Sequence, residues 1–294
     1  MPAILLAGGL GAQMDAIFAN FDMSIFTILG NIQNDILTLI AEMFTSLGDE
    51  LYVIPFAVLG LIMCFFKRTR RVGFTIVIAV IIGTLITNII VKPLFLRVRP
   101  YNTLQGNAEY WSWYVGAHML SESDYCFPSG HTTGVTETAI GLMLCHIASK
   151  RKAAKAAAWI FPIVTFIAGC SRVYLMVHYA TDVIAGWIVG IIAAVLGFVL
   201  SGIICRKIFR KDDTPETARA MKKNIRPGAV LMIALCFLVI WTTSFMRTLS
   251  DGGSASTRCS YSGEYNCQNE VDEKDKYLGS DGNYYCKLHI DEFK

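Results

Sequence analysis

The sequence contains little charge. Only 17% of its 294 residues are Asp, Glu, Lys or Arg, whereas 54% are hydrophobic. This balance argues against an ordinary soluble domain and points to a lipid bilayer. We therefore predict an all-α integral membrane protein, a helical bundle of about six spans. The segments close to spanning length are 52–66, 72–95, 132–148, 156–170, 183–205 and 229–245.

The first fifty residues lack a charged start followed by a cleavage site, so they do not read as a removable signal peptide. Between Ile25 and Phe44 the apolar residues follow helical spacing, and polar residues such as Asn31 and Asp35 interrupt them. This pattern is typical of helices that lie along the membrane interface. We assign residues 1–50 to such interfacial helices. A further span through 20–48 stays open, and it would move the amino terminus to the inside.

The sequence also lacks an internal repeat and any grouping of Asp, Glu, His or Cys with metal-ligand spacing. Five of its nine cysteines lie in or beside apolar spans, where a thiol is an ordinary small hydrophobe. The other four, Cys126, Cys259, Cys267 and Cys286, are predicted to lie outside the membrane. Four thiols allow three pairings, and the sequence does not choose among them.

Basic residues gather in three loops. Residues 67–71, 150–155 and 206–226 together hold 16 of the 26 Lys and Arg residues. Short loops rich in Lys and Arg are retained in the cytoplasm. These three loops follow the first, third and fifth spans, so the joints after the second, fourth and sixth spans should lie outside. Reading these clusters as solvated patches requires three coincidences in the correct alternation.

The same reasoning divides the chain. Residues 51–205 form the predicted catalytic membrane core, and 206–227 form a cytoplasmic basic loop. Residues 228–246 form an additional transmembrane helix, and 247–294 form a polar, cysteine-containing tail outside the membrane.

Three polar clusters occur at the predicted outer ends of the spans. Lys92 is followed after six residues by Arg99-Pro100, Pro128-Ser129-Gly130-His131 opens the third span, and Ser171-Arg172 precedes His178 and Asp182. Charged residues at membrane depth are candidates for function. Lys and Arg suit phosphate binding, although a single cation at a span end commonly extends to the headgroups.

The remaining cluster residues have chemical roles of their own. Ser129 and Gly130 are typical of a helix start, where free N–H groups attract an anion. The imidazole of His131 titrates near neutral pH and suits proton donation. His178 and Asp182 are four residues apart, so on a helix the carboxylate would orient one ring nitrogen and leave the other free to attack phosphorus.

Together these patterns resemble the phosphatidic acid phosphatase type 2 superfamily, whose three signatures, K-x6-RP, PSGH and SR-x5-H-x3-D, are all present in order between Lys92 and Asp182. The resemblance implies that Lys92, Arg99 and Arg172 bind the phosphate and that the Ser129 and Gly130 backbone cradles it. His178 would be transiently phosphorylated, His131 would protonate the leaving group, and Asp182 would orient His178. It also implies catalysis without a metal or another cofactor.

We therefore predict a metal-independent lipid phosphatase of a bacterial-type plasma membrane, acting on its outer face. Its substrate would be a phosphomonoester or pyrophosphate headgroup, of the phosphatidic acid, phosphatidylglycerol phosphate or undecaprenyl diphosphate class. Its partners are the lipid substrate and the bilayer, with no nucleic acid, and the oligomeric state stays open. The alternatives are phosphoryl transfer to an acceptor alcohol, or a non-catalytic lipid transporter or scaffold of the same fold.

Two further features have two interpretations each. The loop 101–127 is rich in Tyr and Trp, which suits either a lipid entrance or an ordinary aromatic belt at headgroup depth. Glu137 is an acid inside the third span. We favour a structural partner for it, such as Asn88 or Thr87, over a direct function.

Overall fold

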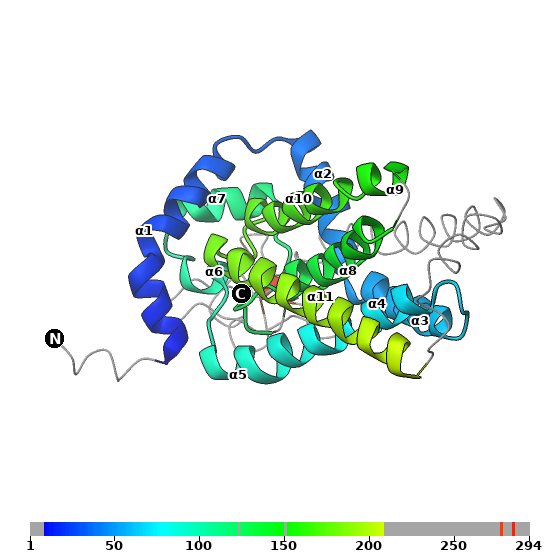
Figure 1. Cartoon of the computed structure of the whole chain (residues 1–294). Helices are drawn as coiled ribbons and strands as arrows, with labels where there is room; N and C mark the ends of the chain where they lie inside the picture. Colours follow the sequence, from blue (N-terminus) through cyan, green and yellow to red (C-terminus); the bar gives the residue numbers. More distant parts are fainter. Residues whose placement is uncertain (1–8, 123, 150–151, 209–276, 279–283, 286–294) are drawn as a thin grey trace.

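The computed structural model describes residues 9–122, 124–149, 152–208, 277–278 and 284–285. The described chain is a helical bundle with one pair of very short antiparallel strands (Figure 1). Its helices are α1 (Leu10–Gly30), α2 (Asp35–Thr45), α3 (Glu50–Cys64), α4 (Arg70–Thr84), α5 (Lys92–Phe95), α6 (Pro100–Thr103), α7 (Ala108–Gly116), α8 (Gly130–Ile147), α9 (Lys152–Ala157), α10 (Ile160–Tyr174) and α11 (Ala180–Ile208). A 3-10 turn (Ser46–Gly48) follows α2, a π-helical segment (Leu85–Val91) joins α4 to α5, and the strands are β1 (Tyr277–Leu278) and β2 (Tyr284–Tyr285).

Five of the six predicted spans fall in the described residues, on α3, α4 with its continuation, α8, α10 and α11. Three helical stretches there are long and apolar enough to cross a bilayer, namely Arg70–Thr103, Lys152–Tyr174 and Ala180–Ile208. The bent pair Asp35–Gly48 and Leu51–Cys64 would make a fourth. Helix α8 is less apolar because it carries Glu137 and several threonines. The chain is thus a helical integral membrane protein, and the count of six spans stays a prediction. The predicted sixth span lies outside the described residues.

Helix α11 packs against both α8 and α4 through small residues. A Cβ atom added at Gly190 would lie 2.5 Å from the Cβ of Thr136, and one added at Gly197 would lie 2.6 Å from the Thr75 carbonyl oxygen. Hydrophobicity does not drive helices together inside lipid, so close backbone packing and hydrogen bonds such as Thr75–Ser201 (2.8 Å) do so. This packing fixes the starts of α8 and α11 beside one another.

The amino-terminal stretch is two helices, α1 and α2, and the break between them falls at the polar residues that interrupt the apolar pattern. The side chain of Asn34 accepts a hydrogen bond from the Leu37 N–H and so caps α2. Gln33 donates to the Tyr174 carbonyl at the end of α10 (3.1 Å), and the Asn34 N–H donates to the Tyr174 hydroxyl (3.2 Å). These polar residues therefore dock the helix break onto α10.

The aromatic residues of the loop 101–127 divide between a packed core and the main cavity. Tyr101, Tyr110 and Tyr114 are buried and their rings stack in sequence. Their hydroxyls donate to the carbonyls of Glu122, Met176 and Leu120, respectively. The rings are thus a packed core that fixes the loop before α8 and the joint between α10 and α11. Tyr125 is exposed and lines the main cavity.

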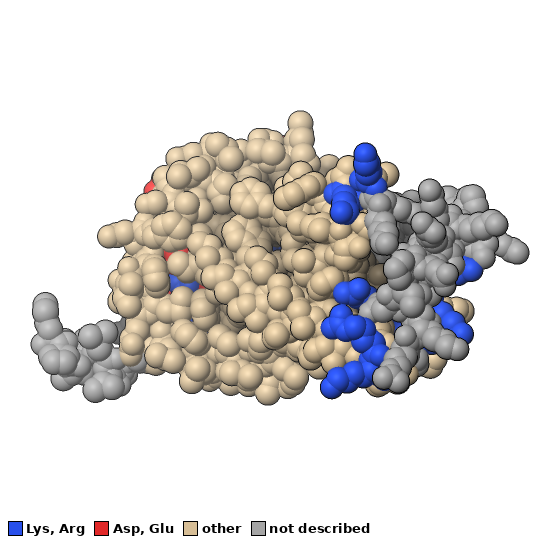
Figure 2. Space-filling view, viewed as in Figure 1, with Lys and Arg blue, Asp and Glu red and all other residues tan. Residues whose placement is uncertain are grey.

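The two ends of the bundle differ in charge. Basic side chains gather at the end where α3, α9 and the last turn of α11 lie (Figure 2). The exposed ones include Lys67, Arg68, Lys152, Lys155, Arg206 and Lys207. Because α8, α10 and α11 run in alternating directions along the chain, the starts of α8 and α11 and the end of α10 lie at the opposite end.

Candidate active site

Three cations from segments remote in the sequence converge at that opposite end. Lys92 begins α5, Arg99 precedes α6, and Arg172 lies in the last turn of α10. All three side chains are buried. They meet on two acids of the loop between α7 and α8, because Arg99 and Arg172 both pair with Glu122, while Lys92 and Arg99 pair with Asp124.

His178 lies in the joint between α10 and α11 and is 1% exposed. Its Nε2 atom is 3.1 Å from Nη1 of Arg99, and its Nδ1 atom is 3.4 Å from Oδ2 of Asp182. The predicted contact with Asp182 is present, although α11 begins only at Ala180 and His178 precedes the helix. Burial, reinforced by Arg99 and Arg172, lowers the pKa of His178 well below its usual value, so the ring is neutral and keeps a lone pair.

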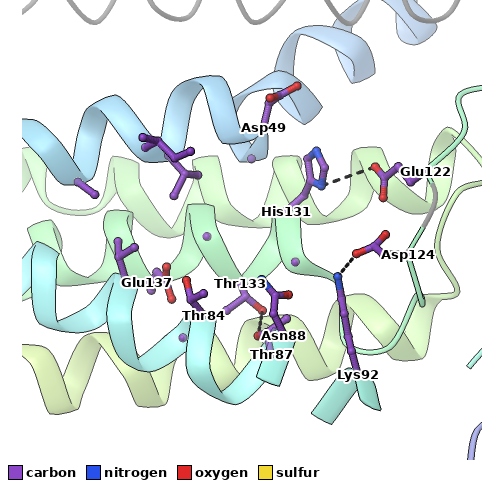
Figure 3. A pocket seen from close by; sticks show the side chains of 18 of the residues that line it. Asp49, Thr84, Thr87, Asn88, Lys92, Glu122, Asp124, His131, Thr133 and Glu137 are labelled. Atoms are coloured by element: carbon purple, nitrogen blue, oxygen red, sulfur yellow. Dashed lines mark hydrogen bonds and ion pairs between the residues drawn. The ribbon is translucent and has the colours of Figure 1, made fainter. Parts of the chain in front are cut away.

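Glu122 lies between the two predicted catalytic imidazoles. Its Oε1 atom is 3.7 Å from Nδ1 of His131, and its Oε2 atom is 3.8 Å from Nε2 of His178. Figure 3 shows Glu122 pointing toward His131, with Asp124 reaching Lys92 beside it. Burial alone would raise the pKa of Glu122, but Arg172 and Arg99 outweigh it and hold that pKa well below its usual value. Glu122 is therefore an anion within the cationic cluster.

Ser129 and Gly130 begin α8 as predicted. The Ser129 hydroxyl accepts hydrogen bonds from the N–H and the hydroxyl of Thr132, and its own N–H donates to the Asp182 carbonyl (3.1 Å). Ser129 thus joins α8 to α11. A Cβ atom added at Gly130 would lie 3.5 Å from Nζ of Lys92, so Gly130 lies against this cation.

Glu122, Asp124 and Arg97 are site residues that our sequence analysis missed. Arg97 is fully buried behind Asp182. Its Nη1 atom donates to Oδ1 of Asp182 (2.5 Å), its Nη2 atom donates to Asp22 of α1 (2.9 Å), and its guanidinium stacks on the Tyr179 ring. The available signal was a third basic residue between Lys92 and Arg99, at the same predicted membrane face.

A cavity of about 1230 Å³ opens onto the cluster. It reaches Lys92, His131 and Arg172, but Arg99 and His178 are not among the described residues that line it. Glu122 and Asp124 line the cavity; Glu122 contacts both Arg99 and His178, and Asp124 contacts Arg99, so these acids lie between the two residues and the cavity. Away from the cluster, the cavity runs between α3 and α4 along apolar side chains such as Val58, Leu61 and Val77.

Two other predictions concern metals and cysteines. Within the described ranges, three or more His, Cys, Asp or Glu side chains nowhere come together in a way that could hold a metal ion. Cys126 is a buried free thiol that donates to the Arg97 and Val98 carbonyls. The other three cysteines predicted to lie outside the membrane are beyond the described residues.

Several known proteins are similar to this chain. An undecaprenyl-diphosphatase of Sulfolobus acidocaldarius is 31% identical over 174 residues, which cover 58% of this chain and 73% of that protein. A phosphatidylglycerophosphatase B of Bacillus subtilis is 28% identical over 163 residues, covering 54% of this chain and 70% of that protein. The crystal structure of a transmembrane PAP2-type phosphatidylglycerolphosphate phosphatase from Bacillus subtilis has the same fold. Its TM-score is 0.54 at 24% identity, over 67% of this chain and 93% of that one.

The sequence profile of the PAP2 superfamily matches residues 69–203, a stretch that contains all eight predicted site residues from Lys92 to Asp182. The Sulfolobus relative is similar across most of its own length. The chain therefore belongs to the PAP2 superfamily and is an integral membrane phosphatase.

Proposed function

We propose that the protein is a metal-independent lipid phosphatase that works through a phosphohistidine at His178. The observation that carries this proposal is the position of the His178 Nε2 atom, beside Arg99 and across Glu122 from His131. A neutral imidazole held against Asp182 is a nucleophile with an orienting partner. The surrounding cations match the negative charge of a phosphoryl group in transfer.

The reaction would proceed in two displacements. The Nε2 lone pair of His178 attacks phosphorus while the P–O bond to the leaving group breaks, and His131 gives its proton to the departing oxygen. Asp182 accepts the hydrogen bond from Nδ1–H and stabilises the positive ring. His131 then takes a proton from water, which attacks phosphorus, and the P–N bond breaks to release phosphate and neutral His178.

Glu122 would leave the cluster when substrate binds. Its two carboxylate oxygens pair with the same guanidinium groups that we assign to the phosphate, and it separates His178 from the cavity. Two anions do not share such a position, because like charges repel strongly where water is scarce. The loop between α7 and α8 therefore acts as an internal competitor of the substrate.

Arg97 would act as a positioning residue behind Asp182. It donates one hydrogen bond to Asp182 and is held by Asp22, so it links α1 to the orientation of His178. The amino-terminal helix thereby supports the proposed catalytic group, although it precedes the predicted core 51–205.

The apolar part of the cavity supports a lipid substrate, because a hydrocarbon tail gains from burial along Val58, Leu61 and Val77. The relatives named above act on undecaprenyl diphosphate and on phosphatidylglycerol phosphate, and we include phosphatidic acid in the same substrate class.

We further propose that the site faces the outside of a bacterial-type plasma membrane. The exposed basic residues at the opposite end of the bundle support this orientation.

Replacement of the proposed nucleophile tests the mechanism directly. We expect His178→Ala to lower phosphate release by at least about a thousandfold in detergent solution with chelator present. The control is His146→Ala, because His146 lies at the far end of α8, where it contacts the Leu142 carbonyl and the Phe161 ring. Undiminished release by folded His178→Ala protein would refute the proposal.

Removal of the competing charge should affect binding and stability in opposite ways. Glu122→Gln should lower the inhibition constant for inorganic phosphate about tenfold, which is roughly the effect of one charge-assisted hydrogen bond on affinity. It should also lower the unfolding temperature without phosphate, because buried cations lose their partner, and phosphate should restore it. The exposed Glu109 of α7 provides the control Glu109→Gln. Weaker phosphate binding by Glu122→Gln would contradict the role of Glu122.

If Arg97 is a positioning residue, its replacement should affect turnover and leave substrate binding nearly unchanged. Arg97 does not line the main cavity, so Arg97→Met should lower kcat by about tenfold or more while KM changes little. Arg97→Lys, which keeps the charge beside Asp182, should recover part of the loss. Equal turnover in Arg97→Met and the unchanged protein would exclude a positioning role.

Epitope accessibility tests the orientation. A short epitope inserted at Gly106, where the backbone has open space around it, should bind antibody on intact spheroplasts. An epitope inserted at Ala153 in α9, at the basic end, should bind only after permeabilisation. The reverse pattern would place the site on the cytoplasmic face.

A further inference from the structure

Glu137 has no place in the proposed phosphoryl transfer, yet it is buried in the middle of α8. It is 2% exposed and lines the main cavity. Its Oε2 atom has no hydrogen-bond partner within the described part of the chain. The expected partner Thr87 donates to Thr133 instead. A buried polar group without a hydrogen-bond partner is destabilising unless a ligand or a water molecule supplies that hydrogen bond.

The backbone opposite Glu137 leaves space for its carboxyl group. A Cβ atom added at Gly83 of α4 would lie only 1.5 Å from the Oε2 atom. Any larger residue at position 83 would therefore push the carboxyl group away. The position of Glu137 at the cavity wall depends on a glycine in the neighbouring helix.

The wall of the cavity has three chemical layers along α4 and α8. Lys92, Arg172 and His131 form the first. Thr84, Asn88, Thr133 and Glu137 form a second layer, which we call the polar belt, and Figure 3 shows these side chains together between Lys92 and the deeper wall. Val77, Val80 and Leu61 form the apolar third layer. Glu137 follows His131 by six residues, so it lies about 9 Å further along α8 at the helical rise per residue.

We propose that the polar belt is a binding subsite for the glycerol ester segment of a glycerolipid phosphate. This inference rests on the proposed function and adds a substrate class to it. The order phosphate, ester and acyl chain in such a lipid matches the order of the three layers. A protonated Glu137 donates a hydrogen bond to an ester carbonyl and accepts one from a hydroxyl, and the Asn88 amide does the same. An isoprenyl diphosphate offers only hydrocarbon beyond its phosphates and leaves the belt unpaired.

The test compares phosphatidic acid with undecaprenyl diphosphate as substrates of the full chain in mixed micelles. Glu137→Leu should lower kcat/KM for phosphatidic acid about tenfold relative to undecaprenyl diphosphate, the loss typical of one hydrogen bond. Glu137→Gln, which keeps a donor and an acceptor, should retain the preference to within about twofold. Gly83→Ala should act like Glu137→Leu, because the added methyl group displaces the Glu137 carboxyl group. Alanine has a higher helix propensity than glycine, so the change should not weaken α4 itself.

The control is Thr138→Ala, whose hydroxyl bonds only within α8 and does not line the cavity. An unchanged substrate ratio in both Glu137→Leu and Gly83→Ala would overturn the subsite, as would an unchanged protein that hydrolyses undecaprenyl diphosphate alone. Either result would leave the phosphatase mechanism standing. Activity retained in His178→Ala would instead refute the mechanism, so the two failures are distinguishable.

Discussion

The mutual repulsion of three buried cations is the constraint on which the rest of the site depends. Lys92, Arg99 and Arg172 lie together where little water reaches them, and ions that leave water must find close partners of opposite charge. In this structure Glu122 and Asp124 are those partners. We propose that this cluster, which requires an anion, binds phosphate once the loop acids move aside. The same electrostatic requirement thus accounts for both the closed loop and the proposed substrate.

The helical scaffold holds these charges in place from several directions. Glycines in α11 bring α8 and α4 close, and the Ser129 N–H joins the start of α8 to that of α11. Arg97 connects Asp182 to α1, and the tyrosine stack anchors the loop that carries Glu122. The groups around His178 are therefore positioned by helix ends that meet at one end of the bundle. Such preorganised charge is the largest contribution in most enzymes that transfer phosphoryl groups.

The sequence predicted the convergence of Lys92, Arg99, Arg172, His131 and His178, because charge alternation along the chain assigned their clusters to one membrane face. It could not predict Glu122 and Asp124, since acids in a polar loop look like ordinary surface residues until the fold places them among cations. Arg97 was missed for a related reason: its partners Asp15 and Asp22 are more than seventy residues away in the chain. The break between α1 and α2 depends on contacts with Tyr174, which local periodicity does not contain.

The most direct test of the convergence of cations around one imidazole is a structure of the protein with orthovanadate, which mimics the phosphoryl group in transfer. The account predicts vanadium bonded to Nε2 of His178, vanadate oxygens on Lys92, Arg99 and Arg172, and Glu122 displaced from the cluster. Vanadate bound elsewhere, with Glu122 still paired to Arg99 and Arg172, would contradict it.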